Sequence, residues 1–387
     1  MKSYFRQLLG HFACRSLAVG VCLVWLISPL WVFAQTSANR TAKAIPSAST
    51  VRTMGSGPTR IAVLLETRSQ SFGKASDAVI AGIKSAHARD GQGVTVDIIS
   101  VSDTGEDVDQ LLNTLPARGY TFVIGPLTRN GANALADRGA LPLPVLVLNQ
   151  PDSDRRVSNN LIIFGLPVES EGRQVARAAF DDAAMRIPDR RPLKALIISN
   201  STPIGRRSFA AFSDAWRELG GTLVDPVETD GRTGLELKTA IGSATGDVAF
   251  AAVGPDALRA LRATLPKELR LYATSQANSL QPGITMKMPE LDGVRLVDMP
   301  WQLQPDHAAV MAYAKAPTLT HLDFQRLYAL GIDSFRLARE LMGNKQQFEL
   351  DGVTGRLRVD LPADSRVDRT SVLAEYRNGV ITPIEPR

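Results

Sequence analysis

The stretch RIAVLLETRSQSFGKASDAVIAGIKSA, residues 60–86, contains the pattern that decides the fold. Its first seven residues form a short apolar run, which is typical of a strand buried on both faces of a parallel sheet. After a polar turn, apolar side chains recur three or four residues apart, as on one face of a helix: Phe72, Ala75, Val79, Ile83 and Ala86. The stretch therefore predicts one strand–helix unit of an α/β layer.

The same strand–helix pattern continues along the chain in two series. Apolar runs predict strands at 60–66, 94–100, 122–127 and 145–149, and then again at 194–200, 222–228, 248–254 and 271–275. Short connections between alternating strands and helices are typical of right-handed βαβ units. We expect an α/β protein with two lobes, each a mainly parallel sheet flanked by helices.

The last third of the chain departs from this repeat. Residues 322–343 predict one long helix, and two β-hairpins follow with turns at 352–355 and 378–379. The expected lobes are 59–150, with 303–345 returning to it, and 151–302, with C-terminal hairpins over 346–387 at the lobe junction. This is the plan of a hinged ligand-binding protein whose crevice lies at the carboxyl ends of the strands.

The N-terminus predicts export. Basic residues precede an apolar run that ends in Val-Phe-Ala, so residues 1–34 predict a signal peptide cut after Ala34. An uncleaved inner-membrane anchor is the alternative. Cys14 and Cys22 both lie inside the signal and neither fits a lipoprotein cut, so the mature chain has no cysteine. Residues 35–58 then predict a flexible leader to a periplasmic domain.

Charge and histidine spacing exclude two further classes of function. The full chain has 387 residues and a formal net charge of +5, which falls to +2 without the three basic residues of the signal. No basic stripe is present, so nucleic acid is not an expected partner. His87, His307 and His321 lack the spacing of metal ligands, and the sequence predicts no metal site and no cofactor.

A Ser-x-x-Lys motif, Ser71 to Lys74, raises the question of penicillin-type acyl-enzyme chemistry. Such enzymes also need Ser-x-Asn and Lys-Thr-Gly, and the chain has Ser-Asn-Asn at 158–160 and Lys-Thr-Ala at 238–240. The second of these lies in a predicted helix, whereas the enzyme motif lies on a strand. The chain is therefore not expected to be an enzyme, and Ser71 is expected to cap the helix that follows it.

Several segments carry a resemblance to a known family. FVIGPLTRNGANALA, VLVLNQP, LYATSQAN, MPELDGVRLVDMPW, RLYALGIDSFRLA and FELDGVTGRLRVD occur in this order. They resemble the C-terminal domain of the LpoA/LppC family of penicillin-binding protein activators. The resemblance implies a type I periplasmic-binding-protein-like fold and a non-catalytic role in activating a bifunctional class A penicillin-binding protein during peptidoglycan synthesis. The alternative is a periplasmic solute-binding receptor of a transporter that takes a small polar ligand in the cleft.

Candidate ligand contacts are turn and polar residues in the loops at the carboxyl ends of the predicted strands. They are Thr67, Arg68, Ser69, Ser71, Gly125, Thr128, Asn149, Gln150, Ser201, Thr202, Arg206, Ser275 and Gln276. For the loop 66–71, anion binding at a helix start and a purely structural turn are equally supported. Thr128 is expected to cap the next helix. Trp301, in a Pro-bounded loop, is the candidate partner-surface residue, although core packing is the favoured interpretation of its position.

Overall fold

The computed structural model describes residues 52–152, 158–232, 234–242, 246–278, 287–316, 318–361 and 363–384. The predicted signal peptide and most of the predicted leader lie outside these ranges. None of the described helices combines the length and the apolar composition needed to span a bilayer.

The first sheet is mainly parallel. In the described ranges its strands lie in the order β1-β3-β2-β4-β5-β6, and only the edge strand β1 runs antiparallel to its neighbour. The strands are β1 (Arg52–Met54), β2 (Thr59–Leu65), β3 (Val94–Ser100), β4 (Phe122–Ile124), β5 (Val145–Val147) and β6 (Leu161–Ile163).

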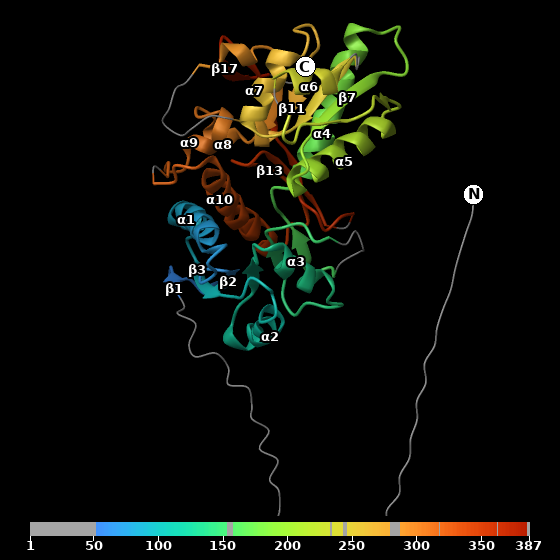
Figure 1. Ribbon diagram of the computed structural model, residues 1–387. Helices are drawn as coiled ribbons and strands as arrows, with labels where there is room; N and C mark the ends of the chain where they lie inside the picture. The colour runs from blue at the N-terminus through green and yellow to red at the C-terminus, as the bar shows by residue number, and fades with distance from the viewer. Residues whose placement is uncertain are drawn as a thin grey trace, which may run out of the picture. The chain divides into compact units, whose positions relative to one another are not determined.

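Strand β2 shows why this sheet is covered by helices on both faces. Ile61, Val63 and Leu65 share a hydrophobic core with α1 and α10, whereas Ala62 and Leu64 share another with α2 and α3. Alternate side chains of a strand point to opposite faces, so a continuous apolar run needs a cover on each. These helices and the first sheet are called the first lobe (Figure 1). The helices are α1 (Gly73–Asp90), α2 (Val108–Thr114), α3 (Arg129–Ala136) and α10 (Leu322–Met342), and a short 3₁₀ turn, η1 (Pro116–Arg118), follows α2.

The second sheet repeats this design and then adds the C-terminal hairpin. In the described ranges its order is β17-β16-β12-β11-β10-β7-β8, and β9 also pairs with β7. Helices α4 and α5 cover one face and α6 and α7 the other; together they form the second lobe. The elements are α4 (Val168–Arg186), β7 (Lys194–Ser199), α5 (Pro203–Glu218), β8 (Thr222–Leu223), β9 (Val227–Glu228), α6 (Gly234–Ile241), β10 (Val248–Ala252), α7 (Pro255–Thr264), β11 (Leu271–Ala273), β12 (Arg295–Asp298), β16 (Val372–Arg377) and β17 (Val380–Pro383).

A small antiparallel sheet, β13-β14-β15, follows α10 in the chain. Its inner side chains, among them Leu357 and Val359, belong to the core that α1 and α10 share. Both predicted hairpins are confirmed as β13–β14 and β16–β17. The remaining elements are η2 (Ser275–Ala277), η3 (Pro289–Leu291), α8 (Pro300–Leu303), α9 (Ala308–Met311), β13 (Gln347–Asp351), β14 (Arg356–Asp360) and β15 (Asp368–Thr370).

The predicted α/β architecture is confirmed, but several boundaries differ. The leader expected to reach residue 58 ends earlier, because Arg52–Met54 already forms β1 against β3. Strand β6 pairs with β5 and so belongs to the first lobe, although the second lobe was expected to begin at 151. The two hairpins do not lie together at the junction, because β16–β17 extends the second sheet.

One predicted strand, 222–228, is divided in the structure. Its two ends form β8 and β9, which both pair with β7. Pro226 lies between them and has no backbone N–H to donate to a neighbouring strand. The apolar run alone could not show that the ladder is interrupted there.

Candidate functional site

The loops at the carboxyl ends of the first sheet are organised around a buried carboxylate, Glu66. The residue follows β2 directly and is 0 % exposed. Its Oε1 accepts hydrogen bonds from the backbone N–H groups of Thr128 at 3.0 Å and Leu127 at 3.2 Å, just ahead of α3. Backbone N–H groups at the start of a helix are a ready anion site. Here the chain's own carboxylate occupies that position.

The loop after β2 corrects the prediction for Ser71. Ser69, and not Ser71, organises the turn, because its Oγ accepts from the backbone N–H groups of Ser71 at 3.2 Å and Phe72 at 3.1 Å. Ser69 also donates to Asp103 at 3.0 Å. Helix α1 begins only at Gly73, so Ser71 lies exposed before it and caps nothing. The Ser-x-x-Lys spacing therefore spans the end of a turn and the start of a helix.

Thr67 and Arg68, the other residues predicted in this loop, form hydrogen bonds within the first lobe. Thr67 is half-buried and donates its backbone N–H to Leu65 at 2.9 Å. Arg68 is exposed, and its Nε donates to Ser100 Oγ at 3.1 Å, at the end of the neighbouring strand β3.

Four further candidates of the first lobe hold the loops after β4 and β5. Thr128 caps α3 as predicted, since its Oγ1 accepts from the N–H of Gly131 at 3.2 Å. Asn149 donates to the carbonyl of Leu127 at 2.9 Å and accepts from the N–H of Gln150, also at 2.9 Å. Gly125 has φ of +99°, and a Cβ there would lie 2.1 Å from the carbonyl oxygen of Leu64. That position requires glycine for the close approach of two strands.

In the second lobe, the loop after β7 is likewise held by its own hydrogen bonds. Thr202 caps α5 by accepting from the N–H of Gly205 at 3.0 Å. Ser201 donates its N–H to Asp230 at 2.8 Å, and Arg206 donates to the carbonyl of Ser201. Ser201, Thr202 and Arg206 remain exposed on this loop.

Ser275 is buried in a polar network that connects the two lobes. Its N–H donates to Glu171 Oε2 at 3.0 Å, and its carbonyl accepts from Arg326 Nη2 at 2.9 Å. Glu171 lies in the first turn of α4 and Arg326 on α10, so the network joins an element of each lobe. Gln276, beside Ser275, is half-buried.

Two buried ion pairs complete this network, called the junction network below. Arg326 pairs with Asp298 at 2.8 Å, with side chains 9 % and 1 % exposed. Arg369 of β15 pairs with Glu171 at 3.1 Å, with side chains 3 % and 7 % exposed. Buried charges need both a partner and hydrogen bonds, and this network supplies both.

Sequence reasoning missed Glu66 and all the charged members of the junction network. One signal was present: Arg326 and Asp333 are charged residues seven positions apart on a predicted apolar helix, hence on one face, and both are buried in the structure. A charge directly after an apolar strand, as at Glu66, was a second signal. Neither signal identifies the partner residue, which lies far away in the sequence.

Trp301 lies in the core, as its favoured interpretation had it, and the alternative of a partner-surface residue is wrong. Its side chain is buried, and Nε1 donates to Gln325 Oε1 at 2.8 Å. The ring packs against Tyr328 at 5.3 Å between centroids, and Lys315 Nζ lies 4.3 Å from the Trp301 ring centroid. Trp301 is therefore a core residue under α10 and is not available to a partner as an exposed anchor.

We expect Glu66→Ala to lower the free energy of unfolding by about 2 kcal/mol, because two buried backbone N–H groups lose their acceptor. Glu66→Gln keeps one carbonyl acceptor and should stay near the wild type at pH 7. Burial raises the pKa of Glu66, so its contribution to stability is full below its unfolded pKa near ~4.3 and falls as the pH rises through the folded pKa.

Urea unfolding of the wild type and of Glu66→Gln at pH 7 and pH 5 would measure how the contribution of Glu66 to stability depends on pH. The stability of the wild type relative to Glu66→Gln should increase at the lower pH. A difference that is constant with pH, or that has the opposite sign, would contradict a raised pKa for the buried Glu66.

Comparisons with known proteins identify the family. The family model described as "LppC putative lipoprotein" matches residues 35–241 and 228–379, which together cover most of the chain. This chain belongs to the LppC family. The LppC-family chain is also 26 % identical over 288 residues to "Penicillin-binding protein activator LpoA" of Histophilus somni, covering 72 % of this chain and 47 % of that protein. The chain thus spans about half the length of the curated relatives it matches.

Two solved structures extend the comparison. The C-domain of LpoA from Haemophilus influenzae, described as "a regulator of PBP1A", has a TM-score of 0.67 at 21 % identity and covers 84 % of this chain and 100 % of that one. A protein of Chromobacterium violaceum, described as "a putative branched-chain amino acid ABC transporter", has a TM-score of 0.66 at 32 % identity and covers 82 % and 99 %. The predicted periplasmic-binding-protein-like fold is confirmed.

Proposed function

We propose that this LppC-family chain is a non-catalytic periplasmic regulator that activates a bifunctional class A penicillin-binding protein by direct contact during peptidoglycan synthesis. The family match across both lobes carries the proposal, together with relatives described as penicillin-binding protein activators. The C-domain that shares the whole fold is described as a regulator of PBP1A, which supports the same class of partner.

The loops of the fold support contact with a protein over capture of a solute. In a solute receptor, backbone N–H groups and charged side chains at the strand ends are kept for the ligand. In this chain Glu66 accepts from the loop before α3, and Glu171 accepts from Ser275 and pairs with Arg369. The chain's own carboxylates therefore use groups that a small anion would need.

For localisation, we propose export by the signal peptide at 1–34 and release into the periplasm by cleavage after Ala34. After cleavage, the leader would be an N-terminal extension of the folded part, which starts by β1 at Arg52. N-terminal sequencing of the protein from a periplasmic extract would test this, and recovery of an intact N-terminus in the membrane fraction would identify an uncleaved anchor.

A solute-binding receptor is the second candidate. It is favoured by the 32 % identity to the Chromobacterium violaceum protein, which this chain covers almost completely. The description of that protein names a branched-chain amino acid transporter, so leucine is the probe for this candidate.

The two candidates can be separated in one experiment. Immobilised exported protein should retain a class A penicillin-binding protein from detergent-solubilised membranes of the source bacterium and should increase its peptidoglycan synthesis in vitro. Its melting temperature should not change with leucine. No retention, together with a thermal shift on leucine, would contradict the regulator and support the receptor.

The absence of catalysis is tested separately with fluorescent penicillin. We expect no covalent labelling of this chain, because the exposed Ser71 lies outside α1 and has no base within the described hydrogen bonds. The retained penicillin-binding protein serves as the positive control in the same gel lane. Labelling of the chain that disappears in Ser71→Ala would identify an acyl-enzyme and overturn this part of the proposal.

A further inference from the structure

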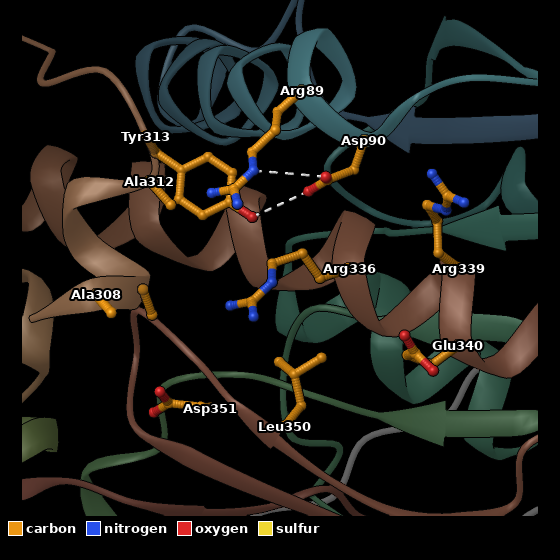
Figure 2. Close-up of a pocket in the computed structure, with 11 residues that line it drawn as sticks. Arg89, Asp90, Ala308, Ala312, Tyr313, Arg336, Arg339, Glu340, Leu350 and Asp351 are labelled. Atoms are coloured by element: carbon orange, nitrogen blue, oxygen red, sulfur yellow. Dashed lines mark hydrogen bonds and ion pairs between the residues drawn. The ribbon is translucent and has the colours of Figure 1, made fainter.

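A pocket of about 530 Å³ lies beside the first lobe, between the C-terminal end of α1, α9, α10 and β13. Figure 2 shows Arg336 projecting from α10 into the pocket, with Arg89 beside the ring of Tyr313 and Arg339 farther along α10. None of the candidate residues predicted from the sequence lines this pocket. It is therefore a separate site from the loops at the strand ends.

The three arginines of the pocket have donors to spare. Within the described part of the chain, the guanidinium of the exposed Arg339 has no hydrogen bond or ion pair. Arg89 has one long ion pair, in which its Nε lies 3.6 Å from Asp90 Oδ1. Within the same part of the chain, Arg336 pairs through Nη1 alone, which lies 3.0 Å from Asp333 Oδ1. An arginine offers five donors, so each of them can still bind an acceptor.

Two of the three acidic residues of the pocket, in contrast, already have donors. Asp90 accepts from the hydroxyl of Tyr313 at 3.2 Å, and Glu340 pairs with Lys345 at 2.5 Å. Asp351 is mostly exposed and lies 3.7 Å from His307 Nε2, beyond hydrogen-bond distance. Burial raises the pKa of Tyr313 to about 12, so its hydroxyl stays protonated as a donor. The free N–H donors of the three arginines can therefore bind a negatively charged hydrogen-bond acceptor. A carboxylate is such an acceptor, and it can bind a guanidinium with bidentate geometry.

The guanidinium groups are also held in place. The central carbons of Arg89 and Arg336 lie 5.4 and 5.9 Å from the ring centroid of Tyr313, within the range of cation–π contact. Such contacts reduce the conformational freedom that a free arginine would lose on binding. Two of the three cationic groups are thus oriented before any ligand arrives.

One side of the pocket is formed by β13, which is an edge strand. Leu350 and Asp351 of β13 line it, and in the described ranges β13 pairs with β14 alone, so that it is the edge of its sheet. An edge strand presents unpaired backbone N–H and C=O groups, which an extended segment of another protein can pair with. An edge strand beside arginines suits a segment that is both extended and acidic.

We propose that this pocket and the β13 edge form the docking site for an extended acidic segment of the partner protein, whose carboxylates bind Arg339, Arg89 and Arg336. The inference rests on the proposed function for the identity of the partner, a class A penicillin-binding protein. The chemistry of the segment is set by the pocket itself. Alternate residues of the segment carry the carboxylates, because alternate side chains of a strand share one face.

A synthetic peptide tests the pocket without the partner. Fluorophore-labelled acetyl-Val-Glu-Val-Asp-Val-amide should bind the wild-type chain, as measured by fluorescence anisotropy, and its amide analogue acetyl-Val-Gln-Val-Asn-Val-amide should bind at least about tenfold more weakly. Binding of the acidic peptide should also weaken as salt rises from 50 to 500 mM. Absence of binding, or equal binding of the two peptides, would overturn the inference.

Charge reversals locate the binding. Arg339→Glu should weaken binding of the acidic peptide by about tenfold or more, and Arg89→Glu is a second variant from a different helix. The matched control is Arg177→Glu on α4, which is also exposed and without an ion pair in the described ranges. All three should melt like the wild type. Wild-type affinity in both pocket variants would overturn the inference, as would equal losses in the control.

Retention of the penicillin-binding protein separates this inference from the proposed function. If the wild-type and Arg339→Glu chains retain the partner equally, the docking site is wrong and the regulator proposal stands. If the wild type retains no partner, the regulator proposal fails, while the peptide titration still reports on the pocket. If Arg339→Glu no longer retains the partner but Arg177→Glu does, the result supports both the docking site and the regulator proposal.

Discussion

Asp298→Ala should lower the free energy of unfolding by about 3–5 kcal/mol, because the buried Arg326 loses its buried partner and keeps only the exposed Asp323, at 2.9 Å, as an ion pair. Asp298 also accepts from Asn278 Nδ2 at 2.8 Å and from the N–H of Met299 at 2.8 Å, and both donors would lose their acceptor. Arg326 cannot escape the cost by losing its proton, because a guanidinium stays protonated in proteins. Urea unfolding measures the effect.

A double variant and a surface control make this prediction specific. Replacing the pair by Arg326→Met with Asp298→Leu should recover the part of the loss that comes from the uncompensated charge of Arg326, whereas Asn278 and Met299 still lose Asp298 as their acceptor. Asp214→Ala removes the partner of Arg217 in an exposed pair on α5 and should change stability by less than about 0.5 kcal/mol. If Asp298→Ala behaves like Asp214→Ala, the junction network does not stabilise the protein.

The second large effect is expected where α1 and α10 cross. Gly82→Ala would place a Cβ 1.9 Å from the carbonyl oxygen of Tyr328, and Gly331→Ala would place one 2.1 Å from that of Val79. Both obstacles are backbone atoms, so no side chain can move aside, and the helices must separate. We expect each variant to lose about 3 kcal/mol, more than the ~1 kcal/mol that alanine gains over glycine in a helix.

The control for this prediction is Gly139→Ala. A Cβ at Gly139 meets no atom within 4 Å, and the residue lies exposed outside the helices. Thermal unfolding of the three variants should show losses for Gly82→Ala and Gly331→Ala only. Wild-type stability in either helix variant would show that α1 and α10 are not in backbone contact in solution.

Both predictions concern contacts that no local pattern could predict. The sequence predicted α1 and α10 from their apolar stripes, and it predicted that 303–345 returns to the first lobe. It could not show that Gly82 and Gly331 face each other, because the crossing point depends on how two helices far apart in the chain are placed on one sheet. The same applies to Asp298 and Arg326, which come from a strand and a helix on either side of α8 and α9.

The sequence by itself determined the local order of this protein. Continuous apolar runs such as 60–66 specify strands covered on both faces, and Asn378 and Gly379, with φ of 53° and 75°, specify the tight turn between β16 and β17. These features depend on the period of apolar side chains and on the conformational freedom of single residues. Both act over a few neighbouring positions, so they can be predicted from the sequence alone.

Only the tertiary structure decided what the polar residues do. Ser69 replaces Ser71 in the turn before α1, Trp301 is buried under α10, and the carboxylates of Glu66 and Glu171 occupy loop positions where a ligand was expected. A buried charge takes the partner that the fold brings within about 3 Å, wherever that partner lies in the chain. The spacing of two residues in the sequence does not determine the distance between them in the fold. The pocket beside β13 could therefore be found only from the structure, in which α1, α10 and β13 lie together.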